Sequence, residues 1–312
     1  MPDFNAYLGP LEELKNCTIC PRNCHVNRNS PNLGYCRSDA EFNISSICIH
    51  RGEEPAVNGK NGICNIFFMH CNLQCMYCQN YQISDNRISP DTILTLEEVI
   101  SQVTAILDQG IDRVGFVSPS HYIPHVKVII AVLRSLGYNP VFVFNTNSYD
   151  KPEAIRSMEG LIDIYLPDLK YLEPELARNY SDAPDYPEIA MASIKEMFRQ
   201  KGSALHFNKE GAAMSGIIIR HLVLPGHSDN SFKVLQFIAE ELSPRLHVSL
   251  MSQYYPTPQV SCHPKLHKPI SAEEYASAVE EMERLGLHNG WVQEMESSAH
   301  YNPDFEKDHP FE

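Results

Sequence analysis

The stretch that decides the fold is residues 71–80, which read CNLQCMYCQN and follow the apolar run Asn65–His70. It brings together three cysteines, Cys71, Cys75 and Cys78. Thiolates are soft ligands that suit iron–sulfur clusters far better than a single hard cation. A four-iron cluster held by three cysteines keeps one iron without a protein ligand, and an open position is where a metal centre does chemistry. A zinc site and a chance group of buried thiols are the alternatives.

The spacing C-x3-C-x2-C, with Tyr77 before the last cysteine and Asn80 after it, resembles the radical S-adenosylmethionine (SAM) superfamily and its activating-enzyme branch. The resemblance implies a [4Fe-4S] cluster at the three cysteines, with the open iron chelated by the amino and carboxylate groups of SAM. It further implies reductive cleavage of SAM to a 5′-deoxyadenosyl radical that abstracts hydrogen from a substrate. A low-potential electron donor such as flavodoxin or ferredoxin is the partner that this chemistry implies.

Length and composition limit the class of protein. The chain has 312 residues, 43% of them hydrophobic, which is enough for one large domain with an appendage. A formal net charge of -14 argues against a nucleic-acid-binding protein. No apolar run is long enough to span a membrane, and residues 1–14 lack the features of a signal peptide, so we expect a cytoplasmic protein. Ten cysteines in that compartment indicate metal ligands or free thiols rather than disulfides.

The chain divides into three segments. Residues 1–62 form a Cys-rich extension with little apolar periodicity, residues 63–300 alternate between strands and helices, and residues 301–312 form a tail. Strands are expected at 65–69, 113–117, 141–145, 162–166, 217–224 and 246–251, and helices at 95–109, 121–136, 151–158, 187–200, 230–242 and 271–285. Six such units predict a parallel α/β protein. The resemblance implies a partial (β/α)6 barrel of the radical SAM type, with functional loops at the C-terminal ends of its strands.

Three further strand ends match the superfamily. They carry Asn145 with Thr146, then Asp168 and Lys170 in a D-x-K pattern, then Arg220 in R-x-x-x-x-P-G. These patterns resemble activating enzymes of glycyl radical enzymes, such as the activase of pyruvate formate-lyase. A carboxylate and a cation suit opposite ends of SAM, although an ordinary ion pair is the alternative for Asp168 and Lys170. The resemblance also implies a monovalent cation here, but Asn145 replaces the family's Asp.

Two strand ends depart from the family pattern. Ser118-Pro119-Ser120 stands where Gly-Gly-Glu is usual, so the SAM amino group meets backbone carbonyls or the hydroxyls of Ser118 and Ser120. Alternatively this turn caps the next helix, for which Ser120 is suitable. After the sixth strand Gln253 or Tyr254 stands near the position of the usual His, either as a hydrogen-bond partner of SAM, for which Gln253 is suited, or as a structural residue.

The extension holds four more cysteines, Cys17, Cys20, Cys24 and Cys36, spaced C-x2-C-x3-C-x11-C. Four thiolates close a metal site completely, so they suit an auxiliary iron–sulfur cluster or a structural zinc, with free thiols as the alternative. Because the segment has too little apolar content to fold alone, a metal would supply stability. The three remaining cysteines are expected to be buried small hydrophobic side chains: Cys48, Cys64 and Cys262.

Together these features predict a radical SAM enzyme. It would either activate a glycyl radical enzyme or modify a peptide or small molecule. A non-catalytic iron–sulfur or zinc protein is the alternative, but Asp168, Lys170 and Arg220 favour catalysis because an electron carrier needs no SAM pocket. The sequence does not identify the substrate.

Overall fold

A mostly parallel sheet forms the centre of the computed structural model, which describes residues 4–89, 93–295, 303–307 and 310–311. Its strands are β1 Ile44–His50, β2 Ile63–Phe68, β3 Arg113–Val117, β4 Val141–Thr146, β5 Ile164–Pro167, β6 His206–Phe207, β7 Ala213–Leu222, β8 His247–Met251 and β9 Asn289–Val292. They are ordered β1-β2-β3-β4-β5-β7-β8-β9, with β6 paired to β7. Only β1 and β6 run antiparallel to their neighbours. Within the described residues β1 and β9 do not pair, so the sheet is an open barrel.

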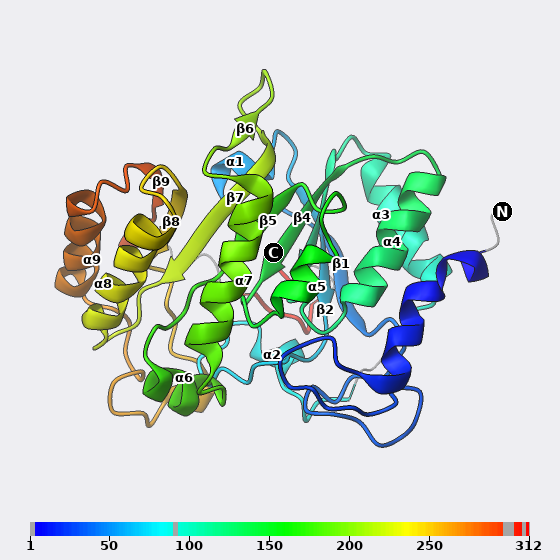
Figure 1. Cartoon of the computed structure of the whole chain (residues 1–312), viewed down its shortest axis with the longest axis horizontal. Coiled ribbons are helices and arrows are strands. Elements are labelled where there is room, and N and C mark those ends of the chain that lie inside the picture. Colours follow the sequence, from blue (N-terminus) through cyan, green and yellow to red (C-terminus); the bar gives the residue numbers. More distant parts are fainter. Residues whose placement is uncertain (1–3, 90–92, 296–302, 308–309, 312) are drawn as a thin grey trace.

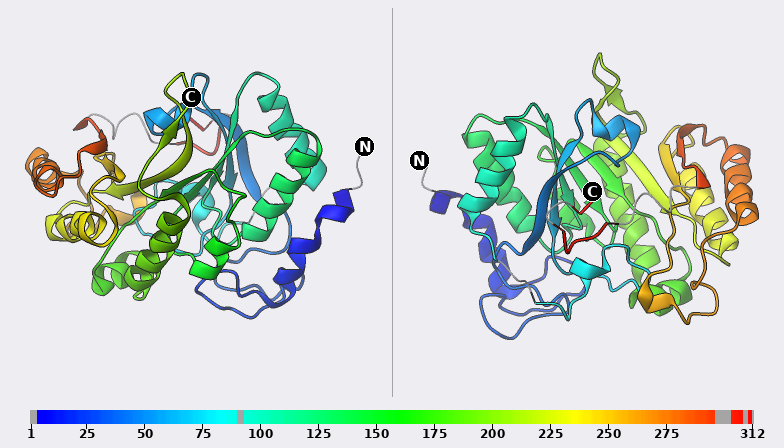
Figure 2. Two further views of the ribbon diagram at one scale, coloured as in Figure 1. Left: turned by 45° about the horizontal axis from the view of Figure 1, so that its top comes forward. Right: turned by 180° about the vertical axis from the view of Figure 1, so that it is seen from behind.

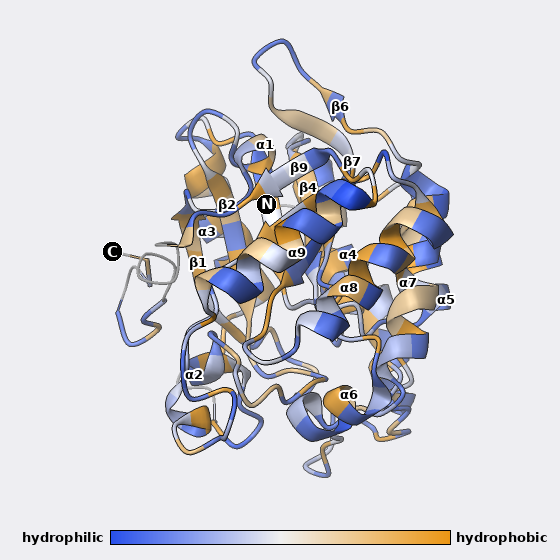
Figure 3. Cartoon of the chain, turned by 90° about the vertical axis from the view of Figure 1, so that its left-hand side faces the viewer, coloured by the Kyte–Doolittle hydropathy of each residue, from blue (hydrophilic) through white to orange (hydrophobic). Residues whose placement is uncertain are grey.

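Helices cover the outer face of this sheet (Figure 1). They are α3 Leu96–Leu107, α4 Ile123–Ser135, α5 Pro152–Arg156, α6 Pro174–Ser181, α7 Tyr186–Lys201, α8 Ser228–Phe237 with a π-helical end Ile238–Leu242, and α9 Ala272–Arg284, besides the short α1 Pro55–Asn58 and α2 Tyr81–Ser84 and the N-terminal 3-10 turns Phe4–Tyr7 and Gly9–Asn16. The buried residues of α3 to α9 join the strands in one large core. Hydrophilic residues follow the outward side of α9 (Figure 3). None of the described helices is long and apolar enough to cross a membrane.

The predicted strand–helix alternation is confirmed, and its caps explain part of that success. Thr95 caps α3 and Ser271 caps α9, each with a glutamate three residues on that bonds back to the cap. This arrangement satisfies amide groups that a helix start otherwise leaves without partners. Most element ends shift by one to three residues from prediction. The largest shift is at β7, which starts at Ala213 because its first residues pair with β6.

Strand β1 was not predicted, and its sequence explains why. Ser45 and Ser46 interrupt the apolar alternation that marks a half-buried strand, and the pairing with β2 is irregular between Ile44 and Ser46. Through β1 the extension joins the barrel's own sheet. Leu14 and Phe42 also lie in the barrel's main core. The extension therefore packs directly on the barrel.

The side of the sheet without helices faces the viewer in Figure 2, right. Residues 303–307 and 310–311 lie against this side. There the rings of Phe305 and Phe311 pack against Phe67 of β2, with centroids 5.3 and 5.6 Å away. The other residues of the predicted tail lie outside the described part of the chain.

Candidate active site

One cavity, with a volume of about 600 Å³, gathers most of the predicted site residues. It lies within the open barrel and reaches the loop that follows β2. The predicted residues that line it are Cys71, Cys75, Tyr77, Cys78, Asn80, Ser118, Asn145, Thr146, Asp168, Lys170, Arg220 and Gln253. Residues far apart in the sequence thus meet because parallel strands bring their C-terminal ends to one edge.

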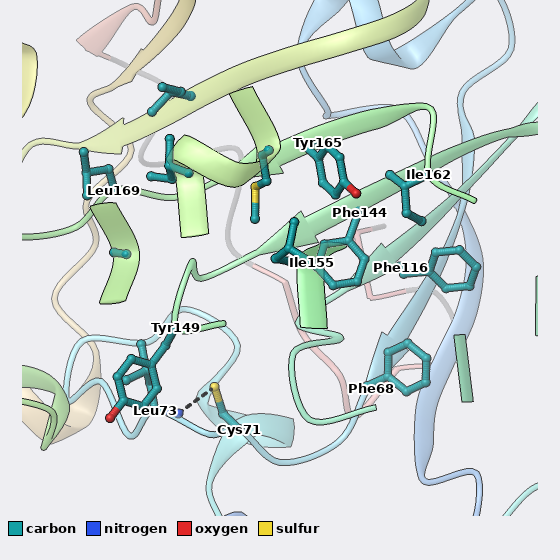
Figure 4. Close-up of a cluster of buried hydrophobic side chains, with 14 of the residues drawn as sticks. Phe68, Cys71, Leu73, Phe116, Phe144, Tyr149, Ile155, Ile162, Tyr165 and Leu169 are labelled. Atoms are coloured by element: carbon teal, nitrogen blue, oxygen red, sulfur yellow. Dashed lines mark hydrogen bonds between the residues drawn. The ribbon is translucent and has the colours of Figure 1, made fainter. Parts of the chain in front are cut away.

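Each of the three cysteine sulfurs accepts a hydrogen bond. The amide of Leu73 donates to Cys71 Sγ over 3.3 Å, as Figure 4 shows. The hydroxyl of Ser181, at the end of α6, donates to Cys75 Sγ over 2.9 Å. The hydroxyl of Ser84, at the end of α2, donates to Cys78 Sγ over 3.1 Å. Such donors stabilise negative charge on sulfur and tune a bound cluster. Neither serine was predicted.

Burial also affects these thiols. It raises the pKa of the Cys75 thiol to about 11, while the charge of Lys170 acts to lower it. A metal that binds here must therefore displace protons from the thiols. Lys170 lies close enough to act electrostatically on Cys78 as well.

Asparagine side chains hold the cysteine loop. Cys71 donates its amide to Asn86 Oδ1, and Asn86 Nδ2 returns a bond to the Cys71 carbonyl, both over 3.0 Å. Asn147 Nδ2 donates to Asn72 Oδ1 over 2.9 Å. Asn72 in turn donates to the Tyr149 carbonyl over 2.7 Å. The loop is thus fixed by specific bonds to two other segments. Asn147 directly follows the predicted pair Asn145 and Thr146, whereas nothing in the sequence marked Asn86.

Charged residues from two strand ends and Asn145 from a third form a network in the cavity. Asp168 accepts from Lys170 Nζ over 2.7 Å and from Arg220 Nε over 2.8 Å. Burial acts to raise the pKa of Asp168, but the two cations outweigh it and lower this pKa. Arg220 also donates to Asn145 Oδ1 over 2.7 Å. The strand-end ion pair considered for Asp168 and Lys170 therefore exists, and it lies inside the cavity beside the cysteines.

The extension contributes two carboxylates to the same cavity. Glu53 accepts from Asn65 over 2.9 Å and lies 3.7 Å from Arg220. Glu54 is buried, and burial raises its pKa. Sequence patterns gave these two glutamates no role, because only the fold shows that β1 leads their segment into the barrel.

The predicted residues after β3 and after β8 do not all line the cavity. Ser118 lines the cavity, whereas Ser120 is buried beside it and shares a 3.0 Å hydrogen bond with Thr146. Ser120 does not cap α4 either, since the cap position is Tyr122. Tyr254 anchors its loop by donating to the Leu266 carbonyl over 2.6 Å, so of the two candidates after the sixth strand only Gln253 lines the cavity.

The four cysteines of the extension line a second, small cavity outside the barrel. Cys48 and Cys64 are buried, as predicted, but Cys262 is exposed. That part of the prediction is wrong because Val260 and Leu266 carry this loop into the core, while Cys262 between them lies at the surface. In the described part of the chain, no three His, Cys, Asp or Glu side chains lie close enough to ligate one metal ion. A four-iron cluster spreads its cysteine ligands over separate irons, unlike a single ion.

Comparisons with known proteins identify the family of this chain. The family model of the radical SAM superfamily matches residues 65–238. An uncharacterised protein of Methanocaldococcus jannaschii is 29% identical over 278 residues, which cover 88% of this chain and 76% of that protein. The match therefore runs through most of both proteins.

The chain is also similar to three solved structures. SuiB of Streptococcus suis, bound to its precursor peptide SuiA, is 13% identical with a TM-score of 0.49, over 74% of this chain and 48% of SuiB. HydG of Carboxydothermus hydrogenoformans is 16% identical with a TM-score of 0.47, over 72% of this chain and 52% of HydG. A domain of the pyruvate-formate lyase-activating enzyme of Bacteroides vulgatus is 15% identical with a TM-score of 0.40, over 55% of this chain and 93% of that domain. The chain spans about half the length of SuiB and HydG.

The family model covers more than half of the chain, from strand β2 through the cysteine loop to α8. This chain belongs to the radical SAM superfamily.

Proposed function

We propose that the protein is a radical SAM enzyme that holds a [4Fe-4S] cluster at Cys71, Cys75 and Cys78 and binds SAM in the adjoining cavity. The single observation that carries this proposal is the meeting of those cysteines with Asp168 and Lys170 in one cavity. An electron carrier has no need of such a cavity. Its volume of about 600 Å³ also falls in the range of small-molecule sites.

The residues present fit these cofactors. Three sulfur donors on one loop match a cluster that keeps one iron free, and each sulfur has a hydrogen-bond donor. When bound, the cluster supplies the electron that cleaves SAM to a 5′-deoxyadenosyl radical able to abstract hydrogen. The chain's own contribution is to hold the cluster and orient SAM beside it.

Lys170 and Arg220 provide the positive charge that a SAM carboxylate needs. Lys170 has three N–H donors and gives one to Asp168, so others remain for a ligand. Asp168 holds both cations in place. Arg220 bonds both Asp168 and Asn145, so it already supplies positive charge at the turn where the resemblance implies a monovalent cation. Ser118 and Gln253 are among the polar groups that line the same space and could bind the rest of SAM.

For the substrate, we propose a protein or peptide, with a glycyl radical enzyme as the partner that the D-x-K and R-x-x-x-x-P-G patterns support. The electron donor would be a low-potential carrier of the flavodoxin or ferredoxin type. Modification of a small molecule would use the same radical and the same cavity.

The test is 5′-deoxyadenosine release from SAM by protein reconstituted and reduced under anaerobic conditions. Cys75→Ala should lose the cluster at this loop and all SAM cleavage. Cys64→Ala is the matched control, because Cys64 is a fully buried cysteine of β2 outside the cavity. If Cys75→Ala cleaves SAM as fast as Cys64→Ala, the proposed function is wrong. A reduced, cluster-loaded wild type that releases no 5′-deoxyadenosine would instead indicate a non-catalytic iron–sulfur protein.

A further inference from the structure

The four cysteines of the extension face one another across the second cavity. Cys17, Cys20, Cys24 and Cys36 all line it. Their sulfurs are close enough for charge on the other three to act on Cys20. The chain between Cys24 and Cys36 folds back to achieve this, and it does so at Gly34. A Cβ there would lie 2.8 Å from Cys24 Sγ, so only glycine allows the backbone to approach this closely.

Main-chain amides point at these sulfurs. The amide of Tyr35 donates to Cys24 Sγ over 3.3 Å. Ile19 and Arg22 provide backbone hydrogen bonds to Cys17 and Cys20 respectively. In both cases the donor lies two residues after the cysteine, as Leu73 does after Cys71. The loop that carries Cys71, Cys75 and Cys78 is called the catalytic loop below. Amides aimed at sulfur stabilise thiolates rather than thiols.

Two arginines line the same cavity without a carboxylate partner among the described residues. Arg28 is only 1% exposed, and its hydrogen bonds to oxygen go to the main-chain carbonyls of Asp39 and His121. Its guanidinium also contacts Cys17. Arg22 donates to the Asn72 carbonyl, and its Nη2 is buried without a partner. An uncompensated buried guanidinium is costly, so an anion is expected beside them.

A metal–tetrathiolate centre has the charge that these arginines need. Four thiolates with Zn²⁺, or with a [4Fe-4S]²⁺ core, leave two net negative charges, and two guanidinium groups balance them. We propose that Cys17, Cys20, Cys24 and Cys36 hold such a centre, with Arg22 and Arg28 as its counter-ions. A four-iron core spreads its thiolate ligands over separate irons, which suits sulfurs that do not lie close enough to ligate one ion. Zn²⁺ gives the same charge but requires the four sulfurs to move together, and the experiment below distinguishes the two metals.

The centre also supports the catalytic loop. Asn86 Nδ2 donates to the Tyr35 carbonyl over 2.9 Å and to the Cys71 carbonyl over 3.0 Å. Arg22 Nε donates to Asn72, the next residue of that loop, over 2.9 Å. Arg22 and Tyr35, from the segment of the second centre, are therefore bonded to the loop of Cys71 and to the asparagine that holds it. Loss of the centre loosens the loop, so it positions the catalytic cysteines without touching the substrate.

Metal content tests the first part of the proposal. In a chain with Cys71, Cys75 and Cys78 all changed to Ala, we expect a residual centre: four irons with a visible sulfide–iron absorption, or one zinc without absorption. Adding Cys20→Ala should remove it. A triple variant that folds but binds neither metal overturns the proposal. The metal content of this variant does not bear on the proposed function, because that function depends on the cluster at Cys71, Cys75 and Cys78, which the variant lacks.

Chelator competition in the same triple variant tests the counter-ions. Arg28→Met should weaken metal retention at least about tenfold, because one compensating charge is lost. Arg28→Lys keeps the positive charge and should therefore retain most of the metal that Arg28→Met loses. Arg113→Met is the matched control: Arg113 is also fully buried but pairs with Asp112, away from both cysteine sites. If Arg28→Met fails to fold, the half-buried Arg22 is tested as Arg22→Met. Retention equal to that of the Arg113 control overturns the charge assignment.

The support of the catalytic loop has its own measurement. Cys20→Ala in an otherwise unchanged chain should lower, several-fold, the fraction of protein that keeps the catalytic cluster under chelator. Unchanged retention overturns this part of the proposal.

Discussion

The two cysteine sites differ in how their surrounding charges are balanced. At the barrel site, Lys170 and Arg220 are already paired with Asp168. At the extension site, Arg22 and Arg28 have no carboxylate partner among the described residues: they bond main-chain carbonyls and stack on tyrosine rings, and Arg28 also contacts Cys17. The cations of the barrel site thus already have a carboxylate partner, whereas those of the extension site would be balanced by the charge of the proposed centre.

The sites also differ in space. The three barrel cysteines open into a cavity of about 600 Å³ with polar groups from several strands. The four extension cysteines enclose a small one lined largely by their own segment. A fourth cysteine closes a metal centre, while a missing one leaves room for a substrate. The number of cysteines and the size of the cavity beside them together distinguish the proposed catalytic centre from the proposed supporting one.

The largest expected effect comes from removing one ligand at each site. Cys78→Ser should lower SAM cleavage by orders of magnitude, because the cluster that supplies the electron is lost. Cys24→Ser should leave a measurable share of the activity, since it removes a supporting centre. Chromatography of 5′-deoxyadenosine, together with iron and zinc analysis, measures both. Equal and complete loss of activity and metal in the two variants would break the distinction between the sites.

A smaller effect is expected from the charge pair in the cavity. Lys170→Met should weaken SAM binding about ten- to a hundredfold, which corresponds to roughly 1.5–3 kcal/mol for a charge-assisted contact. The cluster itself should remain. SAM titration of the reconstituted protein measures this affinity.

The control for that variant is Lys233→Met, which breaks an exposed ion pair with Glu173 on the outer side. Surface pairs of this kind contribute little. Equal SAM affinity in the two variants would make Lys170 an ordinary structural partner of Asp168.

Much of the fold and part of the site were predictable from local signals. Apolar periodicity and the caps at Thr95 and Ser271 mark the strand–helix units. Because the C-terminal ends of parallel strands meet at one edge, the order of strands and helices along the chain is enough to predict that Asp168 and Arg220 lie together.

The remaining features depend on packing between distant segments. Ser181 reaches Cys75 only because α6 ends beside the cysteine loop. Ser120 shows the opposite failure, since its position after β3 suggested the cavity while its side chain turns into the core. Neither outcome follows from sequence spacing, which orders residues along a strand end but does not determine where each side chain points.

The smallest effect concerns the hydrogen bonds to sulfur. Ser181 has one hydroxyl hydrogen, and it donates this hydrogen to Cys75 Sγ. Tyr171 must then donate to Ser181, and Tyr77 to Tyr171, so the three hydroxyls form a chain in which each bond polarises the next.

Ser181→Ala should make the cluster's reduction potential more negative by about tens of millivolts, because the donor stabilises the added electron. Tyr171→Phe should shift it in the same direction but less, since it acts one bond further away. Ser193→Ala, which removes a buried hydroxyl without a hydrogen-bond partner on α7, should leave the potential unchanged. Redox titration followed by electron paramagnetic resonance measures all three, and a shift for Tyr171→Phe as large as that for Ser181→Ala would contradict a chain that ends at Cys75.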